Sequence, residues 1–125
     1  MRKMIFASLL TNVAVLIPVC GGLLLGASWA AETFGAATPA RGILLSVYGA
    51  ILMVSIGLFL RPDPLLVAPL LLVQVLYKLT TPFTVGTFAN PVVISNIAIA
   101  ALHLITLGLI FGQVRLTASA RHVVR

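Results

Sequence analysis

Residues 42–60 read GILLSVYGAILMVSIGLFL, a stretch without a single charged side chain. A hydrocarbon core about 30 Å thick requires about 20 apolar residues of helix at a rise of about 1.5 Å per residue. Three further stretches meet this requirement, at residues 4–28, 64–84 and 91–112. Only short connectors remain in a chain of 125 residues that is 61% hydrophobic and 8% charged. The sequence therefore predicts a single membrane domain, an all-α, integral membrane four-helix bundle.

Basic residues indicate how the four segments cross the bilayer. The larger group shares one side of the membrane after four crossings, and it consists of Arg2, Lys3, Arg61, Arg115, Arg121 and Arg125. Arg41 and Lys78 lie nearer the other side. Because cytoplasmic loops of membrane proteins carry an excess of Lys and Arg, both termini and a polar tail at residues 113–125 are predicted to be cytoplasmic. The basic residues form no helix face for a phosphate backbone, which argues against a nucleic-acid partner.

The first segment has an alternative interpretation as a secretory signal. Arg2 and Lys3 precede an apolar run, and Ser28–Trp29–Ala30 resembles a small-residue cleavage site. Apolar cores of signals are about 7–15 residues long. This run is longer, so a retained first helix is predicted. Cys20 is the only cysteine, and we expect it to be a small buried hydrophobe because it has no partner for an internal disulfide.

Small residues mark the helix faces that are predicted to pack closely. Gly22 and Gly26 form a GxxxG motif, which lets two helix backbones approach each other. The second segment repeats the pattern with Ser46, Gly49 and Gly57. These five positions are the predicted helix-packing residues.

Prolines and small residues predict the connectors. Residues 30–41 are rich in Ala, Gly and Thr and are predicted to be a linker. The turn Arg61–Pro62–Asp63–Pro64 is so short that the second and third helices are predicted to be antiparallel neighbours. Pro82 disfavours helix at Thr81, so the third helix is expected to end or bend there, before a loop that lies in the outer interface or dips into the bundle. Asn90–Pro91 suits the cap and first residue of the last helix.

Polar side chains inside the third and fourth segments are the candidate functional residues, because a polar group in hydrocarbon is costly. Gln74, Tyr77 and Lys78 lie close together on one helix, and Asn96 and His103 share a face of the next. In an antiparallel hairpin, Gln74 and His103 would meet near mid-membrane. We predict that these five residues line a ligand-binding pocket reached from the outer leaflet. Lys78 would supply charge there, and His103 would accept a proton or orient the ligand.

Each of these residues also has a purely structural interpretation. In the last turn of its helix, Lys78 would complement the helix dipole and extend to the interface. His103 would hydrogen-bond a neighbouring helix, and Gln74 and Asn96 would join helices in the same way. The sequence leaves both interpretations open.

The sequence contains few residues that could form a catalytic or metal-binding site. His103 is the one histidine within a predicted segment, and neither Glu32 nor Asp63 lies in one, so a metal site would lack ligands. The sequence has no Ser/His/Asp arrangement, phosphate loop or dinucleotide fingerprint. We therefore expect no metal, no cofactor and no enzymatic activity.

The pattern Arg41…Tyr48–Gly49–Ala50…Gly57, together with the chain length and the four-segment layout, resembles small four-helix bacterial membrane proteins of the DoxX-like kind. The resemblance covers the general layout of the chain. It implies a four-helix architecture in a bacterial cytoplasmic (inner) membrane, and some members of that group are linked to respiratory or redox complexes. No functional residue carries over from it to this sequence.

Two classes of function fit these observations. We favour a non-catalytic accessory or structural subunit that packs against partner helices, because every feature has a packing explanation. The alternative is an oligomeric small-solute carrier or channel, or a hydrophobic-ligand binder, that uses the intramembrane pocket. The uncharged loop at residues 82–90 suggests the binder. The expected partners are the lipid bilayer and either further copies of this chain or another membrane protein.

Overall fold

The computed structural model describes residues 1–124, and this part of the chain contains helices and no strand. The helices are α1 (Arg2–Leu25), α2 (Ser28–Phe34), α3 (Pro39–Leu60), α4 (Pro64–Val85) and α5 (Pro91–Val123). Four of them, α1, α3, α4 and α5, are long and apolar enough to cross a membrane. The prediction of an all-α protein with four such segments is confirmed, and α2 is a fifth helix that the sequence did not predict.

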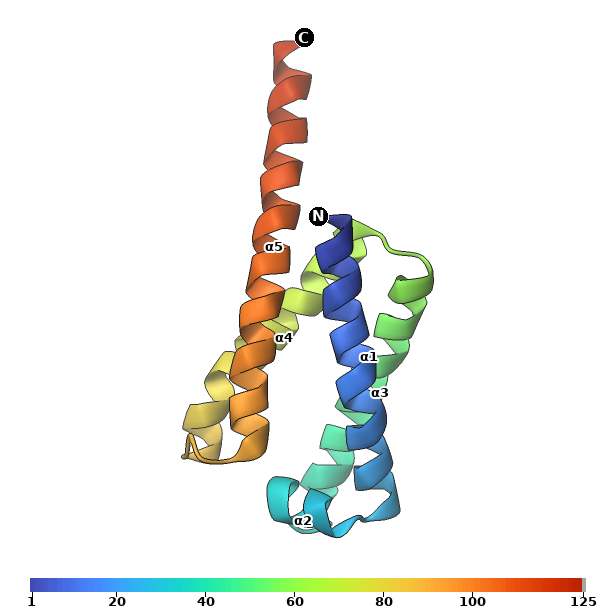
Figure 1. Ribbon diagram of the computed structural model, residues 1–125, viewed down its shortest axis with the longest axis vertical. Coiled ribbons are helices and arrows are strands. Elements are labelled where there is room, and N and C mark those ends of the chain that lie inside the picture. Colours follow the sequence, from blue (N-terminus) through green and yellow to red (C-terminus); the bar gives the residue numbers. More distant parts are fainter. Residues whose placement is uncertain (125) are drawn as a thin grey trace.

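The long helices form two pairs, with α1 packed on α3 and α4 packed on α5 (Figure 1). The pairs meet chiefly where α1 touches α5, and α3 makes few contacts with α4. The sequence predicted α3 and α4 as antiparallel neighbours; they do touch, but each packs mainly on another helix. Each pair also contains a buried polar bond, from Asn12 of α1 to Ser55 of α3 and from Lys78 of α4 to Asn96 of α5.

The first helix ends at Leu25, before the predicted end at Ser28. Gly26 adopts a left-handed conformation with φ of 66°, and the N–H groups of Gly26 and Ala27 both donate to the carbonyl oxygen of Gly22. Glycine takes this conformation without a steric cost, and it commonly terminates helices. The chain then turns into α2, so the predicted linker at residues 30–41 begins as a helix.

This turn changes the interpretation of the GxxxG motif. A Cβ atom at Gly22 would overlap the indole ring of Trp29 in α2, whereas Gly26 has no neighbour within 4 Å of that position. Gly22 makes room for a side chain of the same molecule, and Gly26 ends the helix. Of the two glycines predicted to pack against a helix, Gly22 packs closely against α2, and no described atom lies near Gly26 in this way.

The sequence predicted that the third long helix ends or bends at Thr81. In the structure, α4 does not end there and continues through Pro82 to Val85. Proline lacks the N–H that continues the helical bonding pattern. Neighbouring hydroxyls bond to the carbonyls of this turn, since Thr80 and Thr81 both donate to the carbonyl oxygen of Tyr77. Pro82 removes the N–H that would donate to the carbonyl oxygen of Lys78, whereas these hydroxyls bond one residue earlier, at Tyr77. The loop that follows is exposed and does not dip into the bundle.

The last helix begins as predicted and ends later than predicted. The side-chain oxygen of Asn90 accepts from the N–H of Val92, which is the expected cap. The helix then runs to Val123, well beyond the predicted end at residue 112, and projects past the other helices (Figure 1). No proline interrupts this stretch, and Arg121 and His122 lie in its last turn, where basic side chains complement the helix dipole. The predicted polar tail is thus helical, and its residue 125 lies outside the described residues.

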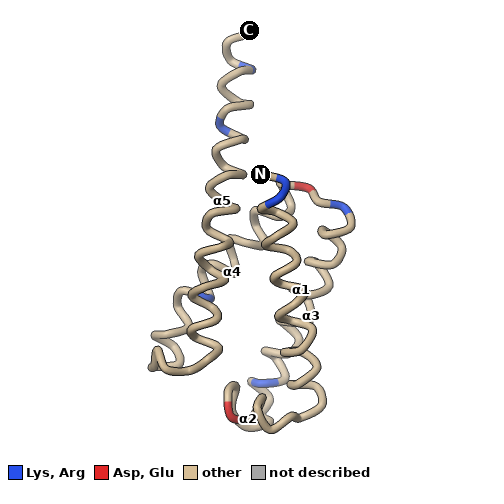
Figure 2. The backbone as a smooth tube through the Cα atoms, in the orientation of Figure 1, with Lys and Arg blue, Asp and Glu red and all other residues tan. Residues whose placement is uncertain are grey.

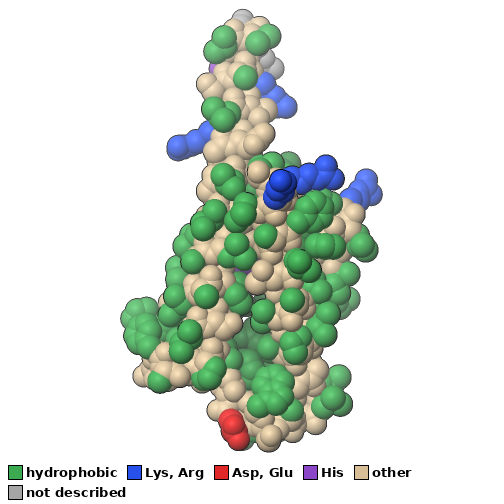
Figure 3. All heavy atoms as spheres, viewed as in Figure 1, with side chains coloured by type: hydrophobic (Ala, Val, Ile, Leu, Met, Phe, Trp, Pro, Cys, Tyr) green, Lys and Arg blue, Asp and Glu red, His purple; other side chains and the backbone are tan. Residues whose placement is uncertain are grey.

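Apolar side chains fill both ends of the interior and cover the outside. The cluster near the termini includes Ile5, Leu9, Leu71, Leu107 and Ile110, and the cluster near α2 includes Leu16, Leu23, Ala30, Tyr48 and Ile51. Hydrophobic side chains also cover the flanks of the four long helices (Figure 3). The charged residues gather at the two ends and on the projecting part of α5, with one exception midway along α4 (Figure 2). That exception is Lys78.

Candidate functional site

Among residues 1–124, eight polar side chains are buried, between and beside the two apolar clusters. They are Ser8, Asn12, Ser55, Gln74, Lys78, Asn96, His103 and Thr106. A buried polar group stabilises a fold only when it is hydrogen-bonded. The bonds among these residues form one network around Asn12, one around Lys78 and a separate Ser8–Thr106 pair, and none of them includes Gln74.

The first network joins three helices at Asn12. Its Nδ2 atom donates to Ser55 Oγ of α3 at 3.1 Å, and its Oδ1 atom lies 3.0 Å from His103 Nε2 of α5. Since an amide oxygen only accepts, this assignment makes His103 Nε2 the donor. Ser8 and Thr106 add a second bond between α1 and α5, at 2.7 Å. This network therefore holds α1, α3 and α5 together.

No hydrogen bond joins Gln74 to His103 among the described residues, and His103 bonds to Asn12. Gln74 and His103 are both buried, at 1% and 0% exposed. Gln74 Nε2 and His103 Nδ1 have no hydrogen-bond partner among the described residues. His103 thus has the interhelical bond of the structural interpretation and retains one unused ring nitrogen.

The second network lies on α4 and α5, nearer to α2. Lys78 is only 5% exposed, and its Nζ atom donates to Asn96 Oδ1 at 3.0 Å. Asn96 Nδ2 donates in turn to Thr81 Oγ1 at 3.3 Å. The amine also lies 4.9 Å from the ring centre of Tyr77. The interpretation in which Lys78 extends outward to the interface was therefore wrong, because the amine turns inward to α5.

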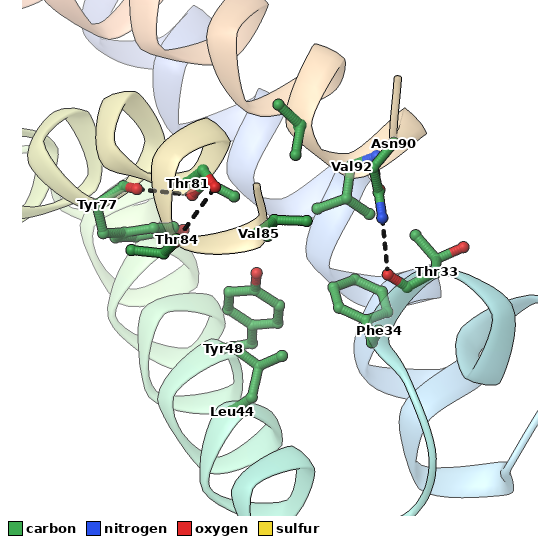
Figure 4. A pocket seen from close by; sticks show the side chains of 11 residues that line it. Thr33, Phe34, Leu44, Tyr48, Tyr77, Thr81, Thr84, Val85, Asn90 and Val92 are labelled. Carbon is green, nitrogen blue, oxygen red and sulfur yellow. Dashed lines mark hydrogen bonds between the residues drawn. The ribbon is translucent and has the colours of Figure 1, made fainter. Parts of the chain in front are cut away.

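A cavity of about 520 Å³ opens beside this network, at the end of the molecule that carries α2 (Figure 4). Four helices contribute to it: Thr33 and Phe34 come from α2, Leu44 and Tyr48 from α3, Tyr77, Thr81, Thr84 and Val85 from α4, and Val92 and Val93 from α5. The hydroxyl of Tyr48 and the ring of Phe34 point into the space below Val85 (Figure 4). The cavity is therefore largely aromatic and aliphatic, with hydroxyls on the α4 side.

Asn90 closes the cavity between α2 and the start of α5. Its Nδ2 atom donates to the carbonyl oxygen of Thr33 at 3.1 Å (Figure 4). The same side chain caps α5 through its oxygen. One asparagine thus connects the short helix to the second helix pair.

A smaller cavity of about 50 Å³ lies next to the first and reaches Lys78 and Asn96. Phe34, Tyr48 and Val92 line both cavities. These three side chains therefore border both spaces, and the amine and the carboxamide line the smaller one, which we call the inner cavity.

The structure brings together three of the five predicted pocket residues. Lys78 and Asn96 line the inner cavity and Tyr77 the outer one, whereas Gln74 and His103 lie elsewhere in the interior. The sequence did not identify Thr33 and Phe34 as lining residues, because it predicted a linker where α2 lies. The sequence also did not identify Ser55 as a residue that bonds between helices. Its hydroxyl within an apolar run is the one feature of the sequence that could have indicated this role.

The predicted helix-packing residues of α3 lie mostly on its outer surface. Ser46 and Gly57 are exposed and Gly49 is half-buried. A Cβ atom at Gly49 or Gly57 would have no neighbour within 4 Å. Close packing inside this chain therefore does not require these glycines.

Within residues 1–124, no three His, Cys, Asp or Glu side chains are placed to hold a metal ion together. Cys20 is a free, half-buried thiol. Comparisons with protein families, with curated proteins and with solved structures give no match to this chain.

Proposed function

We propose that this chain is an integral protein of a bacterial cytoplasmic membrane, with both termini in the cytoplasm. The four long apolar helices support insertion. The excess of basic residues at the end that carries the termini supports the orientation. The cavity beside α2 would then face the outer leaflet. Membership of the DoxX-like group is part of the same proposal.

We further propose that the protein binds a small amphipathic ligand in the cavity beside α2. The observation that carries this proposal is the burial of Lys78 and Asn96 at the inner end of an aromatic cavity. An ionisable side chain inside a membrane is costly and generally marks a functional site. Ligand sites are commonly apolar cavities of about 300–1,000 Å³ with a few polar groups that orient the ligand. The cavity has this character and this size.

A carrier or channel receives less support from the geometry. The cavity lies at one end of the bundle, and the other end is filled by the apolar cluster around Leu9, Leu71 and Ile110. A path for a polar solute would have to cross that cluster. Binding therefore accounts for the cavity more simply than transport does.

A cavity-filling substitution tests the binding function. Val92→Trp places a large ring between the outer and inner cavities and is expected to remove most of the bound ligand. Val73→Trp is the matched control, since Val73 is 60% exposed on the lipid-facing side of α4. The measurement is mass spectrometry of small molecules that remain bound after gentle extraction of the full chain. Equal amounts on both variants, or nothing bound to the unaltered protein, would contradict the proposal.

The outer surface of α3 supports a second candidate, the non-catalytic accessory subunit that packs against partner helices. Gly42, Ser46 and Gly57 are exposed, and they share one side of α3. In membranes, small residues let helices approach closely and so favour association. Since these residues are not used for close packing within the chain, we propose that this face takes a helix from another copy or from a partner protein.

Cross-linking in native membranes tests the accessory role. Ser46→Cys in a Cys20→Ser background is expected to give one defined cross-linked product, because the partner helix would lie against this position. Val47→Cys is the control, since Val47 is 47% exposed on a neighbouring part of the helix surface. The readout is the yield of each product on denaturing gels. Equal yields from the two positions would argue against a specific interface.

A further inference from the structure

We infer that the ligand carries an anionic head group, a carboxylate on a single apolar chain, and that Lys78 and Asn96 bind this head group. The inference rests on the proposed binding function and specifies the ligand. It follows from the charges around the inner cavity, the hydrogen-bond donors at its end, and the different sizes of the two cavities.

The charge balance favours an anion. The sequence contains two acidic residues, Glu32 and Asp63. Glu32 is exposed on α2, and Asp63 caps the first turn of α4, more than three helical turns before Lys78. The amine of Lys78 therefore has the neutral oxygen of Asn96 as its hydrogen-bond partner. Buried charges in membranes are generally paired, so a ligand carboxylate would provide the counter-charge that the chain does not place there.

The donors at the inner end also favour an acceptor-only group. A lysine amine has three N–H donors, and one of them is used for Asn96. The carboxamide of Asn96 has two, and one is used for Thr81. A carboxylate accepts several hydrogen bonds and donates none. The remaining donors of Lys78 and Asn96 are thus suited to bind it.

The different sizes of the two cavities predict a ligand with a compact head group and a larger apolar part. The inner cavity is small, at about 50 Å³. A carboxylate is compact enough to suit this space. The outer cavity has about tenfold more room, at about 520 Å³, and its aromatic and aliphatic walls suit a hydrocarbon chain. Phe34, Tyr48 and Val92 would surround the junction between head and chain.

The position of Trp29 provides a direct assay. It is the only tryptophan, and it lies on α2 together with Phe34, which lines both cavities. Parinaric acid is a conjugated fatty acid whose absorption overlaps tryptophan emission. Its binding to the full chain in neutral detergent micelles is therefore expected to produce energy transfer from Trp29. Near neutral pH, hexadecanoate should displace this probe about tenfold better than hexadecanol, since the alcohol lacks the charge-assisted hydrogen bonds.

Lys78→Met tests the role of the amine. It is expected to remove the preference for the acid and to leave the affinity for the alcohol unchanged, an outcome that a purely structural role would not produce. Lys3→Met is the matched control, because it removes the only other lysine, which is exposed near the N-terminus. Lys78→Arg keeps the charge and should retain part of the preference. The acid-to-alcohol ratio of the unaltered protein tests the inference even where Lys78→Met does not fold.

The outcomes separate this inference from the function on which it rests. Equal displacement by hexadecanoate and hexadecanol would overturn the anionic head group and leave ligand binding intact. A preference for the acid that persists in Lys78→Met would overturn the assignment of Lys78. If parinaric acid gives no energy transfer and neither competitor has an effect, the proposed binding of amphipathic ligands fails, and the inference fails with it.

Discussion

Replacing Asn12 by alanine is expected to lower the free energy of unfolding by about 2 kcal/mol. The substitution removes the bonds to Ser55 and His103 and leaves both of these buried groups without a partner. Hydrogen bonds between membrane helices contribute on average about 0.6 kcal/mol each, whereas an unsatisfied buried group costs about 1–3 kcal/mol. The cost of the stranded partners therefore exceeds the value of the bonds themselves.

The measurement is unfolding in mixed micelles by increasing amounts of SDS, followed by the fluorescence of Trp29. Thr11→Ala is the control, because the hydroxyl of Thr11 bonds only to the carbonyl oxygen of Ala7 in its own helix. We expect this variant to change the stability by less than about 0.5 kcal/mol. If Asn12→Ala were no less stable than Thr11→Ala, Asn12 would not be the residue that joins the three helices.

Leu71→Ala is expected to cost about 1–3 kcal/mol, and the reason differs from that in a soluble protein. Leu71 is fully buried at 0% exposed, in the cluster with Leu9 and Ile110. Lipid tails are as apolar as leucine, so the transfer part of the usual cost is absent and the empty space that remains accounts for the loss. The same SDS titration measures it.

Leu76→Ala is the matched control for this prediction. Leu76 lies on the same helix and is 59% exposed, so its truncation leaves no cavity that lipid cannot fill. We expect its stability to match that of the unaltered protein. Equal losses from Leu71→Ala and Leu76→Ala would show that transfer from water, and not packing between helices, stabilises the fold.

The four long helices could be predicted from the sequence because their signal is local. Each apolar stretch is long enough by itself to cross a membrane, and the cap at Asn90 is recognisable from this residue and the proline that follows it. The end of α1 was harder to place, since Gly26 in an apolar run is compatible with both helix packing and helix termination. The packing of Trp29 against Gly22 shows that the chain turns back after Gly26, so this glycine terminates the helix.

The candidate site could be predicted only in part, because its contacts join distant parts of the chain. The spacing of Lys78 and Asn96 places each on a helix face, but their mutual bond depends on how α4 packs on α5. The bond between Asn12 and His103 spans 91 residues, and no local pattern indicates it. The contribution of Phe34 depends on α2, which is too short to be recognised by hydrophobic periodicity.

The bond from Asn90 to Thr33 has a consequence for the rate at which a ligand exchanges. It is partly exposed and connects α2 to the start of α5 at the mouth of the cavity, whereas the bonds of Asn12 lie buried. A single hydrogen bond contributes about 0.5–1.5 kcal/mol net, so breaking this one is a small local opening compared with unfolding the bundle. Ligand residence time and global stability can therefore vary independently, the first set near the mouth of the cavity and the second in the interior.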